Sequence, residues 1–175
     1  MCNGSTNIRN MMKRNIIAVV TALTIFWLPI GCRNLNTQRN HPSLKSVYRK
    51  DFLIGTALNH HQIQESDEAT HRLITTQFNA VTAENVMKAG PIHPEWGRFN
   101  FEAADRFIDY GKRNGMYIVG HTLIWHSQLP AFVRTMTDAD SLRQFMDLHI
   151  RTVGGRYADA VDCWDVVNEA LNEDG

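Results

Sequence analysis

The sequence has no excess of charge of either sign. Its 18 Lys and Arg residues balance 18 Asp and Glu residues, so the formal net charge at pH 7 is +0. Proteins that bind nucleic acid through its phosphates usually carry a strongly basic surface. The composition therefore argues against a nucleic-acid partner. With 43% hydrophobic and 21% charged residues, the chain has the composition of a globular protein.

Cysteine is also scarce. The chain holds only Cys2, Cys32 and Cys163, too few for the paired cysteines of a disulfide-stabilised scaffold. Cys163 lies within an apolar run and is interpreted as a small buried hydrophobic residue rather than a nucleophile.

No apolar run reaches the length of about 20 residues that an ordinary membrane-spanning helix needs. The longest one, at residues 16–28, follows a basic segment and is typical of a signal peptide, which we assign to residues 1–32. The segment around Cys32 resembles the cleavage site of a bacterial lipoprotein, in which Cys32 would be acylated. Translation starts at Met1 or at one of the internal methionines Met11 and Met12.

This leader predicts an exported protein that touches a membrane only through a lipid anchor, facing the periplasm or the cell surface. Ordinary secretory cleavage and an uncleaved anchor are the alternatives. Residues 33–43 are polar and lack periodic apolar positions, which is typical of a linker.

From residue 44 onward, short apolar runs alternate with segments of helical periodicity. The expected strands lie at 52–58, 78–82, 116–126 and 160–167, and the expected helices run from Ser66 to about 76, from Asn100 to about 115, and over 139–156. This alternation predicts an α/β fold with a parallel sheet. An eight-stranded (β/α) barrel typically needs about 250 residues, so residues 44–175 would supply only about half of one.

Each expected strand is followed by polar or aromatic residues. They are Asn59, His60 and His61 after the first strand, Glu84, Asn85 and Lys88 after the second, His121, Trp125, His126 and Gln128 in and after the third, and Asn168 and Glu169 after the fourth. The carboxyl ends of parallel strands form the ligand-binding edge of a sheet. Aromatic, amide, carboxylate and amino groups together suit a sugar, which offers apolar ring faces and hydroxyl groups.

Each residue also has a structural alternative. Lys88 could be a solvated surface charge, Trp125 could belong to the core, and Asn168 with Glu169 could begin a loop or cap a helix. His121 and His126 have a poor spacing for shared metal binding, so no metal site is expected and a hydrogen-bonded core histidine is the alternative.

Three segments of this chain resemble the family 10 glycoside hydrolases, principally endo-β-1,4-xylanases. They are VTAENVMK at 81–88, GHTLIWHSQLP at 120–130 and WDVVNEA at 164–170, in the family's order and spacing. The resemblance implies a (β/α)8 TIM barrel, with residues 44–175 as its N-terminal half, about the first four βα units. It also implies a xylan or xylo-oligosaccharide substrate and no cofactor.

Residue by residue, the resemblance implies that Glu169 is the general acid/base and that Asn168 binds the 2-hydroxyl of the sugar being cleaved. The residues that it places along the glycone subsites are Glu84, Asn85, Lys88, His121, Trp125 and Gln128. One departure is Ala89, where many members carry a tryptophan; this puts the wall of one glycone subsite in doubt.

A retaining glycosidase needs a second carboxylate about 5–5.5 Å from the first. The family's nucleophile follows its seventh strand, and the resemblance does not extend that far. We therefore expect this chain alone to be inactive and its partner to be the missing C-terminal half of the barrel. The alternatives are a surface lipoprotein that binds xylan without cutting it, and a glycosidase of related barrel fold acting on another β-glycan.

Overall fold

The computed structural model describes residues 41–171. The expected signal peptide at 1–32, with Cys32, and most of the linker at 33–43 lie outside the described residues and stay predictions. Between residues 41 and 171, no helix is both long and apolar enough to cross a membrane.

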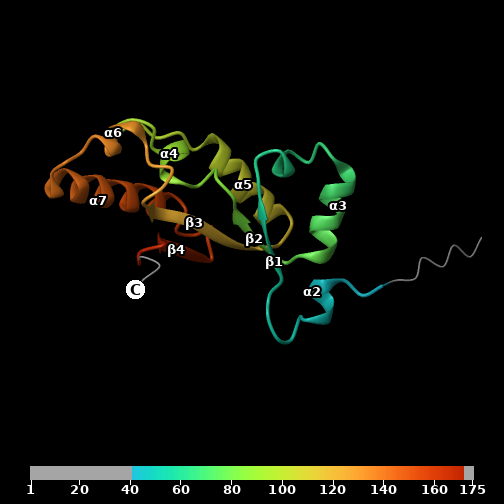
Figure 1. The fold of residues 1–175 in the computed structure, drawn as a ribbon. Coiled ribbons are helices and arrows are strands. Elements are labelled where there is room, and N and C mark those ends of the chain that lie inside the picture. The colour runs from blue at the N-terminus through green and yellow to red at the C-terminus, as the bar shows by residue number, and fades with distance from the viewer. Residues whose placement is uncertain (1–40, 172–175) are drawn as a thin grey trace, which may run out of the picture. The chain divides into compact units, whose positions relative to one another are not determined.

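Four strands form one parallel sheet in the order of the chain. They are β1 (Gly55–Leu58), β2 (Ala80–Ala83), β3 (Tyr117–Trp125) and β4 (Cys163–Asn168). Helices α3 (Glu68–Gln77), α5 (Glu102–Arg113) and α7 (Ala139–Arg156) connect consecutive strands (Figure 1). The expected α/β organisation is therefore present, and the bounds of each strand lie within three residues of the predicted ones.

Helix α7 has the bounds that its periodicity predicts, but two helix starts differ from the prediction. Asp67, not Ser66, caps α3: its carboxylate accepts a hydrogen bond from the Ala69 amide at 3.1 Å. The N-cap position of α5 is Phe101, although the Asn100 side chain still accepts a hydrogen bond from the Glu102 amide at 3.3 Å. A side-chain oxygen that satisfies a free amide favours a helix start, and adjacent polar residues compete for that role.

Short helical turns fill the connections. They are α2 (Leu44–Val47), the 3₁₀ turn η1 (Gln62–Gln64), α4 (Ala89–Ile92) and α6 (Ala131–Arg134). Four residues make barely one helical turn, so they carry no periodic pattern that the sequence could reveal. Helix α4 includes Pro91, which a first helical turn accommodates.

The main core lies between the helices and one face of the sheet. Phe107 and Tyr110 of α5 are fully buried, as are Val81 of β2 and Val153 of α7, and Ile118 of β3 is 1% exposed. Burial of large apolar side chains is the dominant favourable contribution to folding. This core holds the strands in register and thereby fixes where their carboxyl ends lie.

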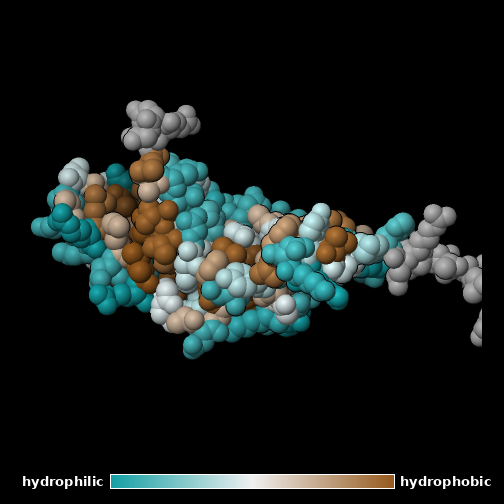
Figure 2. All heavy atoms as spheres, turned by 90° about the horizontal axis from the view of Figure 1, so that it is seen from below, coloured by the Kyte–Doolittle hydropathy of each residue, from teal (hydrophilic) through white to brown (hydrophobic). Residues whose placement is uncertain are grey.

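Strand β4 is an open edge within the described residues. Val166 and Val167 are 47% and 50% exposed, and Figure 2 shows apolar residues gathered over the β4 end of the sheet. The interpretation of Cys163 as buried is wrong: its free thiol is exposed. An apolar run predicts burial only when another element covers the strand, and none of the described elements covers this side of β4.

Candidate active site

The expected catalytic carboxylate meets the expected aromatic residue at the ends of two neighbouring strands. In the β3–β4 register, Trp125 pairs with Asn168, which places Glu169 just beyond the pair. The indole Nε1–H of Trp125 donates a hydrogen bond to Glu169 Oε2 at 2.9 Å. His126 Nε2 lies 3.7 Å from the same oxygen. Glu169 is exposed to solvent, so its carboxylate is both oriented and accessible.

Glu169 has a left-handed backbone conformation with φ of 50°. This region is sterically unfavourable for residues other than glycine and costs of order 1 kcal/mol. Such conformations concentrate at functional sites, where the surrounding structure holds them. Here the conformation follows the end of strand β4, and the Glu169 carboxylate accepts a hydrogen bond from the Trp125 indole N–H.

Asn168 joins the same network through its side-chain amide. In the amide orientation that satisfies both neighbours, its oxygen accepts from Trp125 Nε1 at 3.2 Å and its nitrogen donates to Asp165 Oδ2 at 3.3 Å. Asn168 and Glu169 therefore share one indole N–H. The alternative that they merely begin a loop does not account for these contacts.

Asp165 is a site residue that the sequence reasoning missed. Its Oδ2 lies 2.9 Å from His121 Nδ1, and its backbone oxygen accepts from the Thr122 hydroxyl at 2.8 Å. The His121–Thr122 peptide bond is cis. Asp165 stands inside the WDVVNEA segment, but only the strand register, which pairs it with His121, identifies its partner.

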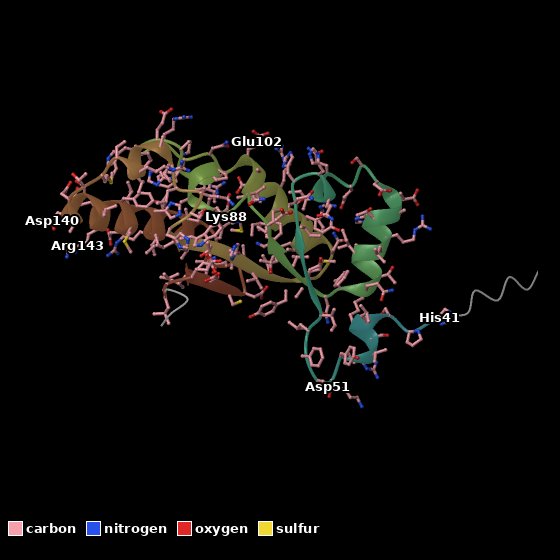
Figure 3. All side chains as sticks on the ribbon, viewed as in Figure 1. His41, Asp51, Lys88, Glu102, Asp140 and Arg143 are labelled. Carbon is pink, nitrogen blue, oxygen red and sulfur yellow. The ribbon has the colours of Figure 1, made fainter. Side chains whose placement is uncertain are left out.

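Lys88, Asn85 and Gln128 form the second part of the site. Asn85 Oδ1 accepts hydrogen bonds from Lys88 Nζ at 3.0 Å and from Gln128 Nε2 at 3.1 Å. Lys88 is only 7% exposed, which excludes the solvated surface charge considered above. Its ammonium lies 4.6 Å from the centre of the Trp125 ring, a cation–π contact. Figure 3 shows Lys88 above β3, in the middle of the molecule.

Glu84 and the polar residues after β1 do not join this network. Glu84 is exposed and, within residues 41–171, its side chain contacts none of the other site residues by a hydrogen bond, so its role stays a prediction. Asn59 Oδ1 accepts from the backbone amides of His61 and Gln62, which is a local turn. His60 Nε2 lies 2.8 Å from Gln64 Nε2.

Ala89 packs into a small apolar cluster with Val133 and Phe145. It is 6% exposed, so this position contributes to packing rather than to an open binding surface. The departure from tryptophan here therefore leaves no large side chain to form a cleft wall at this position.

A cavity of about 300 Å³ lies beside the Glu169 carboxylate. Its polar boundary includes Trp125, His126 and Asn168, and the apolar residues of its lining include Leu142 and Met146 of α7. No group of three His, Cys, Asp or Glu side chains suited to a metal ion occurs in the part of the chain that the structure describes. The arrangement offers an accessible carboxylate, hydrogen-bond donors and an aromatic surface.

Comparison with known proteins agrees with this chemistry. The model of "Glycosyl hydrolase family 10" matches residues 43–175. Endo-1,4-beta-xylanase A of Xylanibacter ruminicola is 39% identical over 158 residues, covering 87% of this chain and 42% of the relative. The beta-1,4-xylanase of Dictyoglomus thermophilum is 42% identical over 132 residues, covering 75% of this chain and 36% of the relative.

Solved structures give the same result for the fold. Xylanase 10B from Thermotoga petrophila RKU-1 in complex with xylobiose superposes with a TM-score of 0.71 at 35% identity, covering 76% of this chain and 42% of that one. The chain thus spans about two fifths of that structure. The predicted fold class is confirmed: the four parallel strands correspond to part of a (β/α)8 barrel. The chain belongs to glycosyl hydrolase family 10.

Proposed function

We propose that this chain carries the proton-donating, glycone-binding half of a retaining endo-β-1,4-xylanase. The observation that carries the proposal is the contact of Glu169 Oε2 with the Trp125 N–H at 2.9 Å, at the carboxyl ends of adjacent strands. The relatives compared above are named as xylanases, which supports xylan as the substrate.

Glu169 would protonate the glycosidic oxygen and then, as a base, activate the water that hydrolyses the glycosyl intermediate. The Trp125 N–H binds one carboxylate oxygen, which leaves the other oxygen to carry the proton. Asn168 uses one amide N–H on Asp165, so its second N–H is available for a sugar hydroxyl. The Trp125 N–H would thus orient both Glu169, the acid, and Asn168, which binds the sugar ring.

Lys88 and Gln128 would bind the sugar on the glycone side. An ammonium has three N–H donors, and Lys88 uses one of them on Asn85. Gln128 likewise uses one of its two amide N–H donors on the same oxygen. The remaining donors can bind sugar hydroxyls, while His121 is held by Asp165 close to the Trp125 ring.

Retention also requires a carboxylate that attacks the anomeric carbon. The carboxylates close to Glu169 do not suit this role, because Asp165 is engaged by His121 and Asn168. We assign the nucleophile to the C-terminal half of the barrel, which would pair with the open edge of β4. That half is the partner that we expect this chain to need.

The first test uses the purified chain alone. We expect no measurable release of reducing sugar from xylan, because one carboxylate cannot form and then hydrolyse a glycosyl intermediate. Turnover by the chain alone that is lost in Glu169→Gln would show that the chain carries a complete site and would refute this part of the proposal.

The second test concerns binding. Trp125→Ala removes the ring beneath Lys88 and the N–H donor to Glu169, so we expect about tenfold weaker binding of xylotriose by calorimetry, since each such contact is worth about 1 kcal/mol. Trp96→Ala is the matched control, because Trp96 is 50% exposed and contacts Phe132 instead.

Equal losses in the two variants would contradict a sugar site at Trp125. Binding of xylotriose without hydrolysis, even after a C-terminal half-barrel is supplied, would instead support a non-catalytic xylan-binding protein. Tighter binding of a cello- or manno-oligosaccharide would indicate a glycosidase for another β-glycan.

A further inference from the structure

Two buried histidines outside the candidate active site contact each other. His93, at the end of α4, and His149 of α7 are both fully buried. Their rings are nearly parallel at 4°, with centroids 5.5 Å apart, and their Nδ1 atoms are 3.4 Å apart. The aromatic rings that stack on or meet His93 edge-on come from Phe99, Phe132 and Phe145.

The hydrogen bonds determine which nitrogen of each ring carries the proton. The Gly97 amide donates to His93 Nε2 at 3.2 Å, so His93 Nε2 must be an acceptor without a hydrogen. The His93 proton is then on Nδ1 and points at His149 Nδ1, which must be the acceptor of that contact. The proton of His149 is therefore on Nε2, an atom that is buried and has no hydrogen-bond partner among the described residues.

A second proton on either ring disrupts this chain of hydrogen bonds. A protonated His93 would direct Nε2–H at the Gly97 N–H, and a protonated His149 would direct Nδ1–H at the His93 Nδ1–H. Both contacts would be between two donors. Burial lowers the pKa of His93, and burial together with His93 lowers the pKa of His149 to about 4.

The charged groups on the surrounding elements do not neutralise the positive charge that a second proton would place on either histidine. On the loop after α4, Glu95 is paired with Arg98. On α7, Asp147 is paired with Arg151. After β3, Arg134 donates to the Leu129 oxygen. Within residues 41–171, none of these groups makes a hydrogen bond to either imidazole, so a proton on the pair would have no counter-ion.

Helix α4 links this pair to the candidate active site. Lys88 occupies the N-cap position of α4, and the Gly90 amide donates to the Gln128 backbone oxygen at 3.0 Å. A Cβ at Gly90 would lie 2.6 Å from that oxygen, so the close approach requires glycine. Gln128 has a left-handed backbone with φ of 49°, and its side chain donates to Asn85.

We propose that His93 and His149 are positioning residues that, while both are neutral, hold α4 on the loop after β3 and keep Gln128 on Asn85. A proton on either ring releases α4, and with it the Gln128–Asn85 pair. We call this contact of the two neutral histidines, which holds α4 in place, the histidine latch. The histidine latch is a property of the fold. Only its consequence for sugar binding rests on the proposed function.

The lowered pKa values of His93 and His149 determine the direction of the pH effect. A histidine whose pKa is lower in the folded state loses stabilisation as pH falls below its unfolded value of about 6.5, down to its folded value. For a single group the population of the open form rises by about tenfold for each pH unit in this window. Carboxylates whose pKa is lowered in the fold protonate mainly below this window.

The test is hydrogen–deuterium exchange of the full chain between pH 7 and pH 5, corrected for the intrinsic exchange rate at each pH. We expect protection of residues 89–100 to fall at least tenfold, while protection of β3 at Tyr117–Trp125 changes far less. In His149→Gln, whose amide oxygen can accept from His93 without titrating, the fall should shrink at least fivefold. His41→Gln, at an exposed histidine, is the matched control and should behave as the wild type.

His149→Phe keeps an aromatic ring at this buried position and provides a second variant should His149→Gln not fold. Protection of 89–100 that does not depend on pH in the wild type would overturn the histidine latch, as would an unchanged fall in a folded His149 variant. In parallel, the dissociation constant for xylotriose should rise from pH 7 to pH 5 more in the wild type than in His149→Gln. An absence of xylotriose binding at both pH values would refute the proposed function, and the exchange result would still decide on the histidine latch.

Discussion

Replacing Glu169 by glutamine in a completed barrel is expected to lower kcat on xylan by about 10²–10⁴-fold, the contribution of a general acid/base. The completed barrel would join residues 41–175 to the remaining part of a xylanase of the family. Glutamine keeps an oxygen that can accept from the Trp125 N–H, so the site geometry is retained and only the transferable proton is lost. The KM for xylan should change little, because the hydrogen bonds that bind the sugar remain.

Substrates with different leaving groups distinguish a loss of proton donation from a general disruption of the active site. In an aryl xyloside with an acidic phenol, the phenolate leaves without protonation. The glycosylation step should therefore be slowed much less in Glu169→Gln with this substrate than with xylan. Pre-steady-state release of the phenol measures that step. Glu95→Gln, at an exposed glutamate paired with Arg98, is the matched control and should retain activity. An equally slowed release from both substrates would argue against Glu169 as the acid.

Gly120→Ala is expected to destabilise the fold by about 1–3 kcal/mol, the usual cost of forcing extra volume into a packed site. A Cβ at position 120 would overlap the indole of Trp164, which faces Gly120 in the β3–β4 register. The indole is rigid, so strand β4 would have to move, and Glu169 lies at the end of that strand. Urea unfolding measures the loss in stability, and the completed barrel should also lose activity.

Gly154→Ala is the matched control for this substitution. Gly154 lies inside α7, and a Cβ there would meet no atom within 4 Å. Alanine should therefore stabilise the helix by about 0.5–1 kcal/mol, because glycine loses more backbone entropy on folding. Changes of the same sign in Gly120→Ala and Gly154→Ala would show that the clash with Trp164 does not decide the outcome.

Much of the fold could be predicted because its signals are local. Helix α7 repeats its apolar face over Ala139–Arg156, and the strands are short apolar runs between polar turns. The four-residue helices carry no such repeat. Helix α4 nevertheless matters, because it links Gln128 to the buried histidine pair.

The meeting of Trp125 with Glu169 was also accessible from the sequence, since the ends of consecutive parallel strands lie together. The partner of Asp165 was not, because it depends on the register that pairs β4 with β3. The exposure of Cys163 was misjudged for a related reason: an apolar strand is buried only where a neighbour covers it.

The amino-acid sequence by itself determined the order of strands and helices, the family, and the residue types that meet at the strand ends, because these follow from local periodicity and from short motifs. Only the tertiary structure decided that Lys88 is buried on the Trp125 ring, that Glu169 takes a left-handed backbone, and that His93 contacts His149. Burial, register and the protonation state of a ring depend on groups that are distant along the chain, and those groups come together only when the helices pack on the sheet.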